Sequence, residues 1–370
     1  MSLLEEVEKS RKKVVTDGYD MSIGELVNLY KDDELIIDPV FQRLFRWDDE
    51  RKSRFVESIL LGIPIPSVFV HQKEDGVWEL VDGLQRLSTI FQLVGILKGE
   101  RAAELGTLVL NGTKLLPGLD GRRWEPSVEG AEDGLGQALQ VFIKRARLRV
   151  EILKSESDLD AKFELFQRLN TGGAALSAQE VRNSMAVSMN NTFYQWLVSI
   201  SEYPAFLNTT NQTATKLDSQ VGVELALRFL AFRNVEYKNG LDVHEYLDTA
   251  LVSVARNSEF DFEEERLTFE RTFDFLDSAL GKNAFKRWNG ANFGGMFLMS
   301  LFEVMAIGVS RNLDALGKMD EGARNNFLLE RAKSLWQEST FTVNSGAGVR
   351  GTTRLAKLLP EAQALTAPTA

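Results

Sequence analysis

The chain changes character near residue 155, and that change constrains its fold more than any other feature. Before it, short β-branched segments alternate with helical patterns, whereas after it one helical pattern follows another. The length of 370 residues suits one large domain or two ordinary ones. We therefore predict an α+β protein, with a mixed α/β N-terminal domain over residues 1–155 and an all-helical C-terminal domain over residues 156–370.

The first half contains a predicted hairpin followed by a helix. Ser67–His71 and Val77–Val81 are short and apolar, and a turn-forming Lys-Glu-Asp-Gly segment separates them. Leu84–Lys98 repeats apolar residues at helical spacing. The other elements expected here are a helix over Arg51–Leu61 ended by Gly62, a glycine-rich loop over 111–138 and a strand over Leu148–Leu153.

The second half is expected to be helical throughout. Ser177 and Glu180 have the spacing of a capping box, so a helix should begin there. The apolar stretch around Glu303 indicates a buried helix. The predicted helices cover 158–169, 177–190, 218–232, 260–280, 293–309 and 323–338.

Composition excludes several classes of chemistry. The chain has no cysteine, which excludes disulfides, thiolate metal sites and cysteine nucleophiles. His71 and His244 are the only histidines, so zinc sites and histidine-based nucleases are not expected. The net charge of −10 argues against a protein that coats DNA, so any DNA contact must come from a local patch. The N-terminus lacks the apolar core of a signal peptide and no long apolar run follows, so we expect a cytoplasmic protein without membrane contact.

The first candidate site lies at Asp82-Gly83-Leu84-Gln85-Arg86, where a strand should end and a helix begin. A helix N-terminus offers free N–H groups to a phosphate, and Arg86 adds a bidentate donor. Gln85 can orient a water molecule, and Asp82 can hold a metal ion or accept a proton. A capped helix start with a solvated Arg86 explains the same residues.

The second candidate segment, Asp38–Trp47, interleaves aromatic residues with arginines. Such a pattern suits a phosphate backbone and stacked bases, with Phe41, Gln42, Arg43 and Arg46 as the contacts. A partner-docking surface would use the same residue types. So would a strand that buries its aromatic side chains.

A third segment joins two predicted helices through Asn170, Gly172 and Gly173. Consecutive backbone N–H groups there can form an anion-binding nest, although a helix-loop-helix joint also needs glycine. The basic segment Lys144–Arg149 can face a polyanion or form a solvated strand edge.

Together the three candidate segments resemble the GmrSD N-terminal domain family, which is related to the ParB/sulfiredoxin fold. The likeness rests on Gln-Arg…Trp, Gly-Ile-Pro-Ile-Pro, Asp-Gly-x-Gln-Arg-Leu-Ser-Thr and a later Phe-x-x-Leu-Asn-Thr-Gly-Gly, and it runs from about residue 20 to about residue 235. Members include prokaryotic restriction and anti-phage defence proteins. The resemblance implies a ParB/sulfiredoxin-like nucleotide-binding domain at the N-terminus.

The resemblance assigns roles to individual residues. In the family, the Asp-Gly-Gln-Gln-Arg motif is associated with nucleoside triphosphate binding and hydrolysis, which implies catalytic roles for Asp82, Gln85 and Arg86. An aromatic-Gln-Arg segment lines the DNA-sensing pocket of some relatives, and Phe41-Gln42-Arg43 after Pro39 matches it. The residues assigned to nucleotide contacts are Gly83, Arg86, Ser88, Thr89, Asn170, Gly172 and Gly173.

Two departures from the family pattern matter. Leu84 replaces the first glutamine of the motif, so hydrolysis would be slowed if that glutamine positions the attacking water. Helical spacing places Leu84 with Leu87 and Phe91, which favours inward packing. Many relatives also carry a C-terminal HNH nuclease, whereas His244 is the only histidine after residue 240.

The leading hypothesis is a defence protein that binds and hydrolyses a nucleoside triphosphate and senses or acts on foreign DNA. Mg²⁺ is expected as the cofactor because phosphoryl transfer needs charge neutralisation. One alternative is a non-enzymatic ParB-like DNA-binding module, in which Arg43, Arg46 and Arg51 contact the DNA backbone. The other is an interaction subunit that regulates a partner nuclease. We also expect a homo-oligomer.

Overall fold

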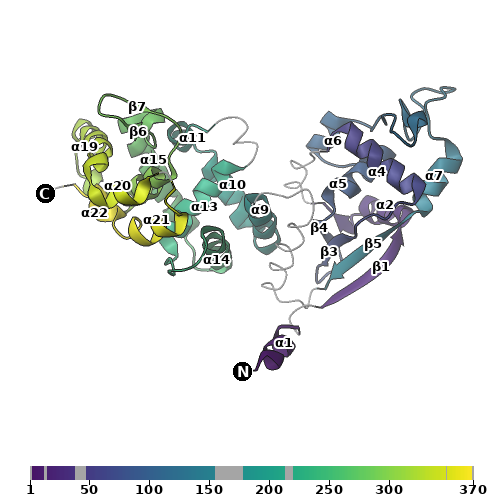
Figure 1. Ribbon diagram of the computed structural model, residues 1–370, viewed down its shortest axis with the longest axis horizontal. Coiled ribbons are helices and arrows are strands. Elements are labelled where there is room, and N and C mark those ends of the chain that lie inside the picture. The colour runs from purple at the N-terminus through teal and green to yellow at the C-terminus, as the bar shows by residue number, and fades with distance from the viewer. Residues whose placement is uncertain are drawn as a thin grey trace. The chain divides into compact units, whose positions relative to one another are not determined.

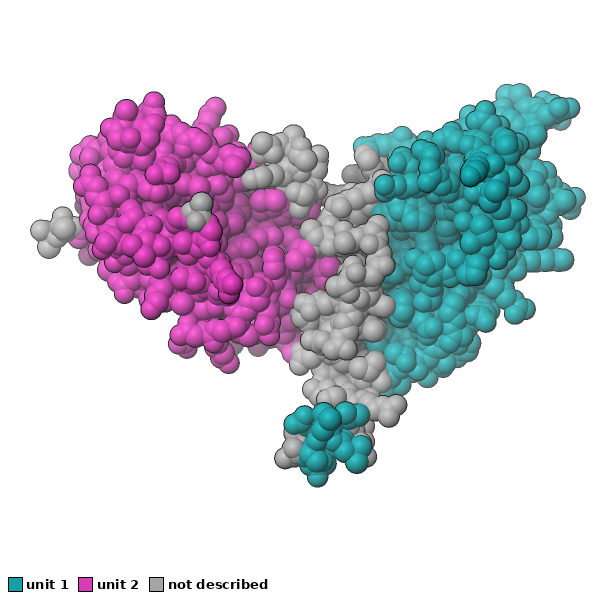
Figure 2. Space-filling model, viewed as in Figure 1, with its two compact units in different colours: residues 1–175 teal, residues 176–370 magenta. Residues whose placement is uncertain are grey.

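The structure is a computed structural model that describes residues 2–11, 15–37, 47–154, 178–212, 220–346 and 348–368. Two compact units divide the chain, residues 1–175 and residues 176–370 (Figure 2). The boundary predicted at residue 155 borders a stretch, 155–177, that lies outside the described residues, so it stays a prediction.

The first unit is a mixed α/β fold (Figure 1). Its elements are α1 Leu3–Arg11, β1 Thr16–Ser22, α2 Ile23–Lys31, β2 Leu35–Ile36, α4 Asp49–Leu61, β3 Val68–Gln72, β4 Trp78–Asp82, α5 Leu84–Val94, α6 Glu100–Leu105, the 3₁₀ turn Pro117–Leu119, α7 Gly136–Arg145 and β5 Arg147–Leu153. Five strands form one sheet in the order β1-β5-β3-β4-β2. Parallel and antiparallel pairs alternate across that sheet, so the predicted α+β class is confirmed for this unit.

The predicted hairpin is β3–β4, with Val70 opposite Leu80. Its turn closes through the Lys73 N–H, which donates to the Val77 carbonyl at 2.8 Å. Gly76 has φ 87°, a left-handed conformation that disfavours other residues. The hairpin thus carries Asp82 to the edge where the next helix begins.

Helix α4 begins and ends where its sequence signals lie. The Asp48 carboxylate accepts a hydrogen bond from the Arg51 N–H, and Gly62 ends the helix with φ 67°. Helix α5 ends earlier than predicted, at Val94 rather than Lys98. Gly95 adopts φ 77° there, and the Ile96 N–H turns back to the Phe91 carbonyl. The prediction followed apolar spacing through a glycine that stops the helix.

The core of the first unit lies between the sheet and its helices. Leu148, Val150 and Ile152 alternate inward along β5. Tyr30 of α2 stacks on Phe91 of α5 with ring centroids 4.0 Å apart. This packing fixes α5, and therefore its N-terminus, against the sheet.

The second unit is built almost entirely from helices. They are α9 Ala178–Met189, α10 Asn191–Ser201, α11 Pro204–Thr210, α13 Val221–Asn234, α14 Val243–Arg256, α15 Phe262–Leu280, α16 Met299–Leu301, the π-helix Phe302–Ala306, α17 Ile307–Arg311, α18 Leu313–Gly317, α19 Glu321–Ser334, α20 Ser339–Ser345, α21 Gly351–Lys357 and α22 Ala362–Thr366, with 3₁₀ turns Gly281–Asn283 and Leu335–Gln337. Phe206, Phe229, Phe269 and Phe273 pack ring against ring in its core. No helix among the described residues is long and apolar enough to cross a membrane.

The predicted helix over 293–309 is partly wrong. Phe293–Gly294 forms strand β7, which pairs with β6 Arg287–Trp288, so the unit is not purely helical. Helical structure begins only at Met299, after Gly295 adopts φ 84°. Glu303 is buried there, and the Arg354 Nε donates to its carboxylate at 2.8 Å. Burial raises the pKa of Glu303, although Arg354 opposes the shift.

Candidate nucleotide-binding site

The first candidate site is a strand–glycine–helix junction, as its sequence predicts. Strand β4 ends at Asp82, Gly83 adopts φ 103°, and α5 begins at Leu84. A Cβ atom on Gly83 would lie 3.0 Å from both γ-methyl groups of Val68 in the neighbouring strand. Both the conformation and the close approach therefore require glycine.

Helix α5 begins without a side-chain cap, because Gly83 has no side chain to accept from the first turn. The Gly83 carbonyl accepts the Leu87 N–H at 3.0 Å, which is the first hydrogen bond of the helix. The residue at the N-cap position therefore supplies no side-chain oxygen to the first turn. The positive dipole end of a helix that begins at a glycine favours an anionic ligand.

Arg86 is fixed beside this N-terminus by two hydrogen bonds. One Nη donates to the Asp82 Oδ2 at 2.8 Å and to the Ser67 carbonyl at 3.2 Å. The Arg86 Nε is buried and has no acceptor among the described residues. The guanidinium is thus preorganised, and it retains donors for a further acceptor.

Gln85 connects the first two candidate segments. Its Oε1 accepts a hydrogen bond from the Trp47 N–H at 3.2 Å, across 38 positions of sequence. The Trp47 ring packs edge-on against Phe55 of α4, with centroids 5.7 Å apart. Trp47, the last residue of the second candidate segment, is therefore held at the first turn of α5.

Ser88 and Thr89, assigned to nucleotide contacts, are buried in α5. Both hydroxyls donate to the Gln85 carbonyl, at 3.2 and 2.6 Å respectively. In this conformation both hydroxyls donate to the backbone of their own helix. Leu84 is only partly buried, in contrast to Leu87 and Phe91, so helical spacing overstated its inward packing.

The other predicted contacts fall outside the part of the chain that the structure describes. Their residues, Phe41, Gln42, Arg43, Arg46, Asn170, Gly172 and Gly173, lie outside the described residues, and their roles stay predictions. Of the second segment, Trp47 alone is described.

A divalent cation would have a limited set of protein ligands. Within the described ranges, no three His, Asp or Glu side chains gather into a metal cage. Asp82 is the carboxylate of the junction, and it already bonds Arg86. Mg²⁺ is commonly held by one or two carboxylates together with the phosphate oxygens of a substrate. Asp82 therefore fits a magnesium ion that would bind together with a nucleotide.

Two features of the surroundings were not visible in the sequence. The contacts from Ser67 and Trp47 use backbone atoms, which leave no residue-type signal. The other feature is His71, which lies beside Glu79 on the adjoining strand. Burial would raise the pKa of Glu79, but the hydrogen bond from His71 and the charge of Lys73 outweigh it, and the pKa is lowered.

Comparison with known proteins identifies one family. Residues 23–187 match the family model described as GmrSD restriction endonuclease, N-terminal domain. The match covers α2 through most of α9 and includes the whole junction. Searches of curated proteins and of solved structures gave no significant match.

Proposed function

We propose that the chain acts in restriction by binding a nucleoside triphosphate at the β4–α5 junction. The role in restriction follows from the match of residues 23–187 to the N-terminal domain of the GmrSD restriction endonuclease family. The observation that carries the proposal is the start of α5 directly after Gly83, with the Arg86 guanidinium fixed beside it. A triphosphate places several anionic oxygens where one helix end and one guanidinium can share them.

Asp82 has a positioning role in this proposal. Its carboxylate fixes the Arg86 fork in the absence of ligand and offsets the charge of the arginine. An incoming phosphate competes for the same guanidinium, which would leave the carboxylate less well paired. Mg²⁺, which supplies charge neutralisation when bound, would be held by Asp82 together with phosphate oxygens.

We expect the bound nucleotide to be hydrolysed only slowly. Leu84 occupies the first position of α5, and its side chain can neither donate a hydrogen bond to a water molecule nor accept one from it. The Gln85 Oε1 is engaged by the Trp47 N–H. We therefore assign nucleotide binding as the principal function and slow turnover as its consequence.

A DNA-linked role fits the same geometry. The bond from Trp47 to Gln85 ties the proposed DNA-sensing segment to the helix that would hold the nucleotide. Nucleotide occupancy and DNA contact would then influence each other, with the cleavage step residing in a partner nuclease. A DNA affinity that does not depend on salt concentration would contradict direct contact with the DNA backbone.

The decisive experiment measures nucleotide affinity by calorimetry, with ATP, GTP, CTP and UTP in the presence of Mg²⁺. Arg86→Ala should weaken binding roughly 10- to 100-fold, because a charge-assisted hydrogen bond contributes about 1.5–3 kcal/mol. Arg266→Ala is the matched control, since Arg266 also pairs with a carboxylate four residues away and bonds a second group. Equal affinities in wild type and Arg86→Ala, or no binding by wild type, would refute the proposal.

A further inference from the structure

A pocket of about 400 Å³ lies in the second unit, between the β6–β7 hairpin and the turn and helix that follow α19. Its lining combines two tryptophans with two basic residues, which are Arg287 and Trp288 of β6, Lys333 of α19 and Trp336 of the 3₁₀ turn Leu335–Gln337. No aspartate or glutamate is among the described residues that line it. The pocket is therefore aromatic and basic, in contrast to the acidic chain as a whole.

Both tryptophan rings are held in place by neighbouring groups. Trp288 packs against Phe293 across the hairpin, with ring centroids 4.9 Å apart. Trp336 meets the buried Phe341 edge-on, with centroids 5.3 Å apart. The hairpin turn is fixed as well, because the Asn289 Oδ1 accepts two backbone N–H groups of the turn, both at 2.9 Å. Both rings are only half-buried, so they present fixed aromatic surface to solvent.

A cation lies over each of the two rings. The Arg287 guanidinium carbon is 5.3 Å from the centroid of Trp336, and the Lys333 Nζ is 5.1 Å from that of Trp288. Lys333 also pairs with Glu330 at 2.7 Å. Arg287 is exposed, and its guanidinium forms no hydrogen bond or ion pair with any residue that the structure describes. Stacking on a ring leaves the N–H donors of a guanidinium available to a phosphate.

The sequence around the pocket is basic, although the chain carries a net charge of −10. Residues 278–302 contain Lys282, Lys286 and Arg287 and no aspartate or glutamate. Residues 339–360, which include α20, contain no acidic residue either. An acidic protein that contacts a polyanion needs a local basic patch of this kind.

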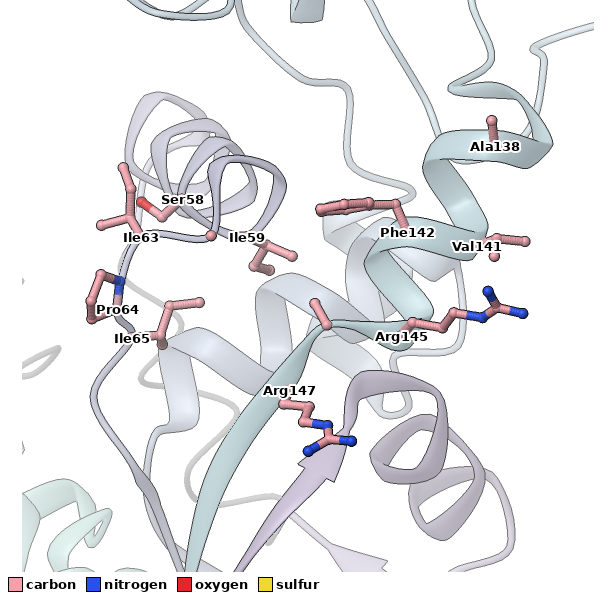
Figure 3. Close-up of a pocket in the computed structure, with 12 residues that line it drawn as sticks. Ser58, Ile59, Ile63, Pro64, Ile65, Ala138, Val141, Phe142, Arg145 and Arg147 are labelled. Carbon is pink, nitrogen blue, oxygen red and sulfur yellow. The ribbon is translucent and has the colours of Figure 1, made fainter.

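The groove of about 570 Å³ in the first unit, between α4 and α7, differs from this pocket. Figure 3 shows apolar side chains on its two sides, with Ile59 and Ile63 on one and Phe142 on the other. The Arg145 guanidinium points away from it (Figure 3). No cation of the described residues lies over the Phe142 ring. Aromatic rings paired with cations therefore distinguish the pocket of the second unit.

We propose that this second-unit pocket binds single-stranded DNA. Bases stack on the solvent-facing surfaces of Trp288 and Trp336, because every base offers a flat π-face to an aromatic ring. The phosphates between them bind Arg287 and Lys333. The site belongs to the second unit, and the proposal does not depend on nucleotide binding at the β4–α5 junction.

The properties of the pocket select this ligand. A single strand is favoured over a duplex because the bases of a duplex already stack on one another and must leave the stack to meet a protein ring. A strand is favoured over a free nucleotide because basic residues continue beyond the lining, at Lys282 and Lys286. DNA is the strand chosen because the matching family model is that of a restriction endonuclease. The Gln337 amide and the Ser345 hydroxyl, which form no side-chain hydrogen bond with the described residues, can bond the base edges.

Fluorescence anisotropy with a short labelled oligothymidylate tests the proposal on the full chain, without nucleotide or Mg²⁺. Trp288→Ala should weaken binding roughly 5- to 150-fold, the effect of losing one stacked base. Arg287→Ala should weaken binding and reduce the slope of log affinity against log salt concentration by about 0.7, the value for one phosphate of a single strand. Arg324→Ala is the matched control, since Arg324 lies 4.0 Å from the Phe275 ring centroid and does not line the pocket. It should bind as wild type does.

Photocrosslinking locates the strand independently of any effect of a substitution on folding. An oligothymidylate that carries 5-bromodeoxyuridine should, after irradiation with the wild-type chain, be linked to peptides that contain Trp288 or Trp336. Absence of binding by wild type, crosslinks confined to the first unit, or wild-type affinity in both Trp288→Ala and Arg287→Ala would overturn the proposal. Equal affinity for a duplex of the same length or for free thymidine monophosphate would also overturn it.

Discussion

Gly83→Ala tests whether the junction geometry depends on this glycine. A residue other than glycine in this left-handed conformation costs about 1–3 kcal/mol. The added Cβ would also lie 3.0 Å from both Val68 methyl groups, and such overpacking costs about 1–3 kcal/mol more. In Gly83→Ala the free energy of unfolding of the first unit should therefore fall by about 2–6 kcal/mol. This is a large part of the stability of an ordinary domain.

Gly76→Ala separates the two contributions. Gly76 also has a positive φ, 87°, but nothing lies within 4 Å of the position its Cβ would occupy. Gly76→Ala should therefore lose only the free energy that the left-handed conformation costs. Gly83→Ala should lose about 1–3 kcal/mol more, because of the contact with Val68.

Hydrogen exchange measured over residues 68–94 reports the stability of the first unit without assuming that the whole chain unfolds in one step. Gly83→Ala should increase exchange there more than Gly76→Ala does. Equal exchange in the two variants would refute the argument from the Val68 contact. Exchange as slow as in wild type would refute the requirement for glycine altogether.

Two further predictions concern turnover and pH. Leu84→Gln introduces the amide that the family motif carries at this position. Nucleotide hydrolysis, measured by phosphate release, should therefore become faster, while the nucleotide affinity stays within about 3-fold of wild type. An unchanged rate of phosphate release would contradict the role given to this position. Glu303→Gln removes a buried carboxyl whose pKa in the folded state is raised. The stability that this carboxyl contributes is therefore fully present below its ordinary pKa, and it is lost as pH rises through the pKa of the folded state. Wild type should therefore lose stability relative to Glu303→Gln as pH rises above about 4.5 in urea titrations, and a constant difference would show that burial does not control this carboxyl.

The sequence predicted a helix or strand correctly where an apolar pattern ended at a turn-forming residue. The hairpin and α4 were found because Gly76 and Gly62 stand where the backbone becomes left-handed. The helix predicted over 293–309 was placed too early, because residues 293–294 form strand β7 and helical structure runs only from Met299. Its buried Glu303 is matched by Arg354, 51 positions away, which no local pattern reveals.

The candidate site was predictable in part for a similar reason. Asp82, Gly83 and Arg86 are neighbours in sequence, so a strand followed by a helix brings them together. The bond between the Trp47 N–H and Gln85 is long-range and uses a backbone donor, so only the structure shows it. Leu84 departs from the family motif, and the structure adds that its side chain is partly exposed at the helix start.

The family match has a consequence for where this protein can be divided. It ends at residue 187, inside α9, a helix of the second unit. Arg182 of α9 is 1% exposed, and its Nε donates to the Asp248 carboxylate of α14 at 2.6 Å. A second nitrogen of Arg182 lies 2.9 Å from the His244 Nδ1.

Removing one partner from a buried ion pair leaves an uncompensated charge, which costs several kcal/mol. A fragment that ends at residue 187 would keep Arg182 and lose both Asp248 and His244. Its last helix would then lose both the carboxylate that pairs with Arg182 and the surface of α14 that packs against α9. The residues that match the family are therefore not a self-sufficient folding unit, and the helical region after them is needed to complete α9.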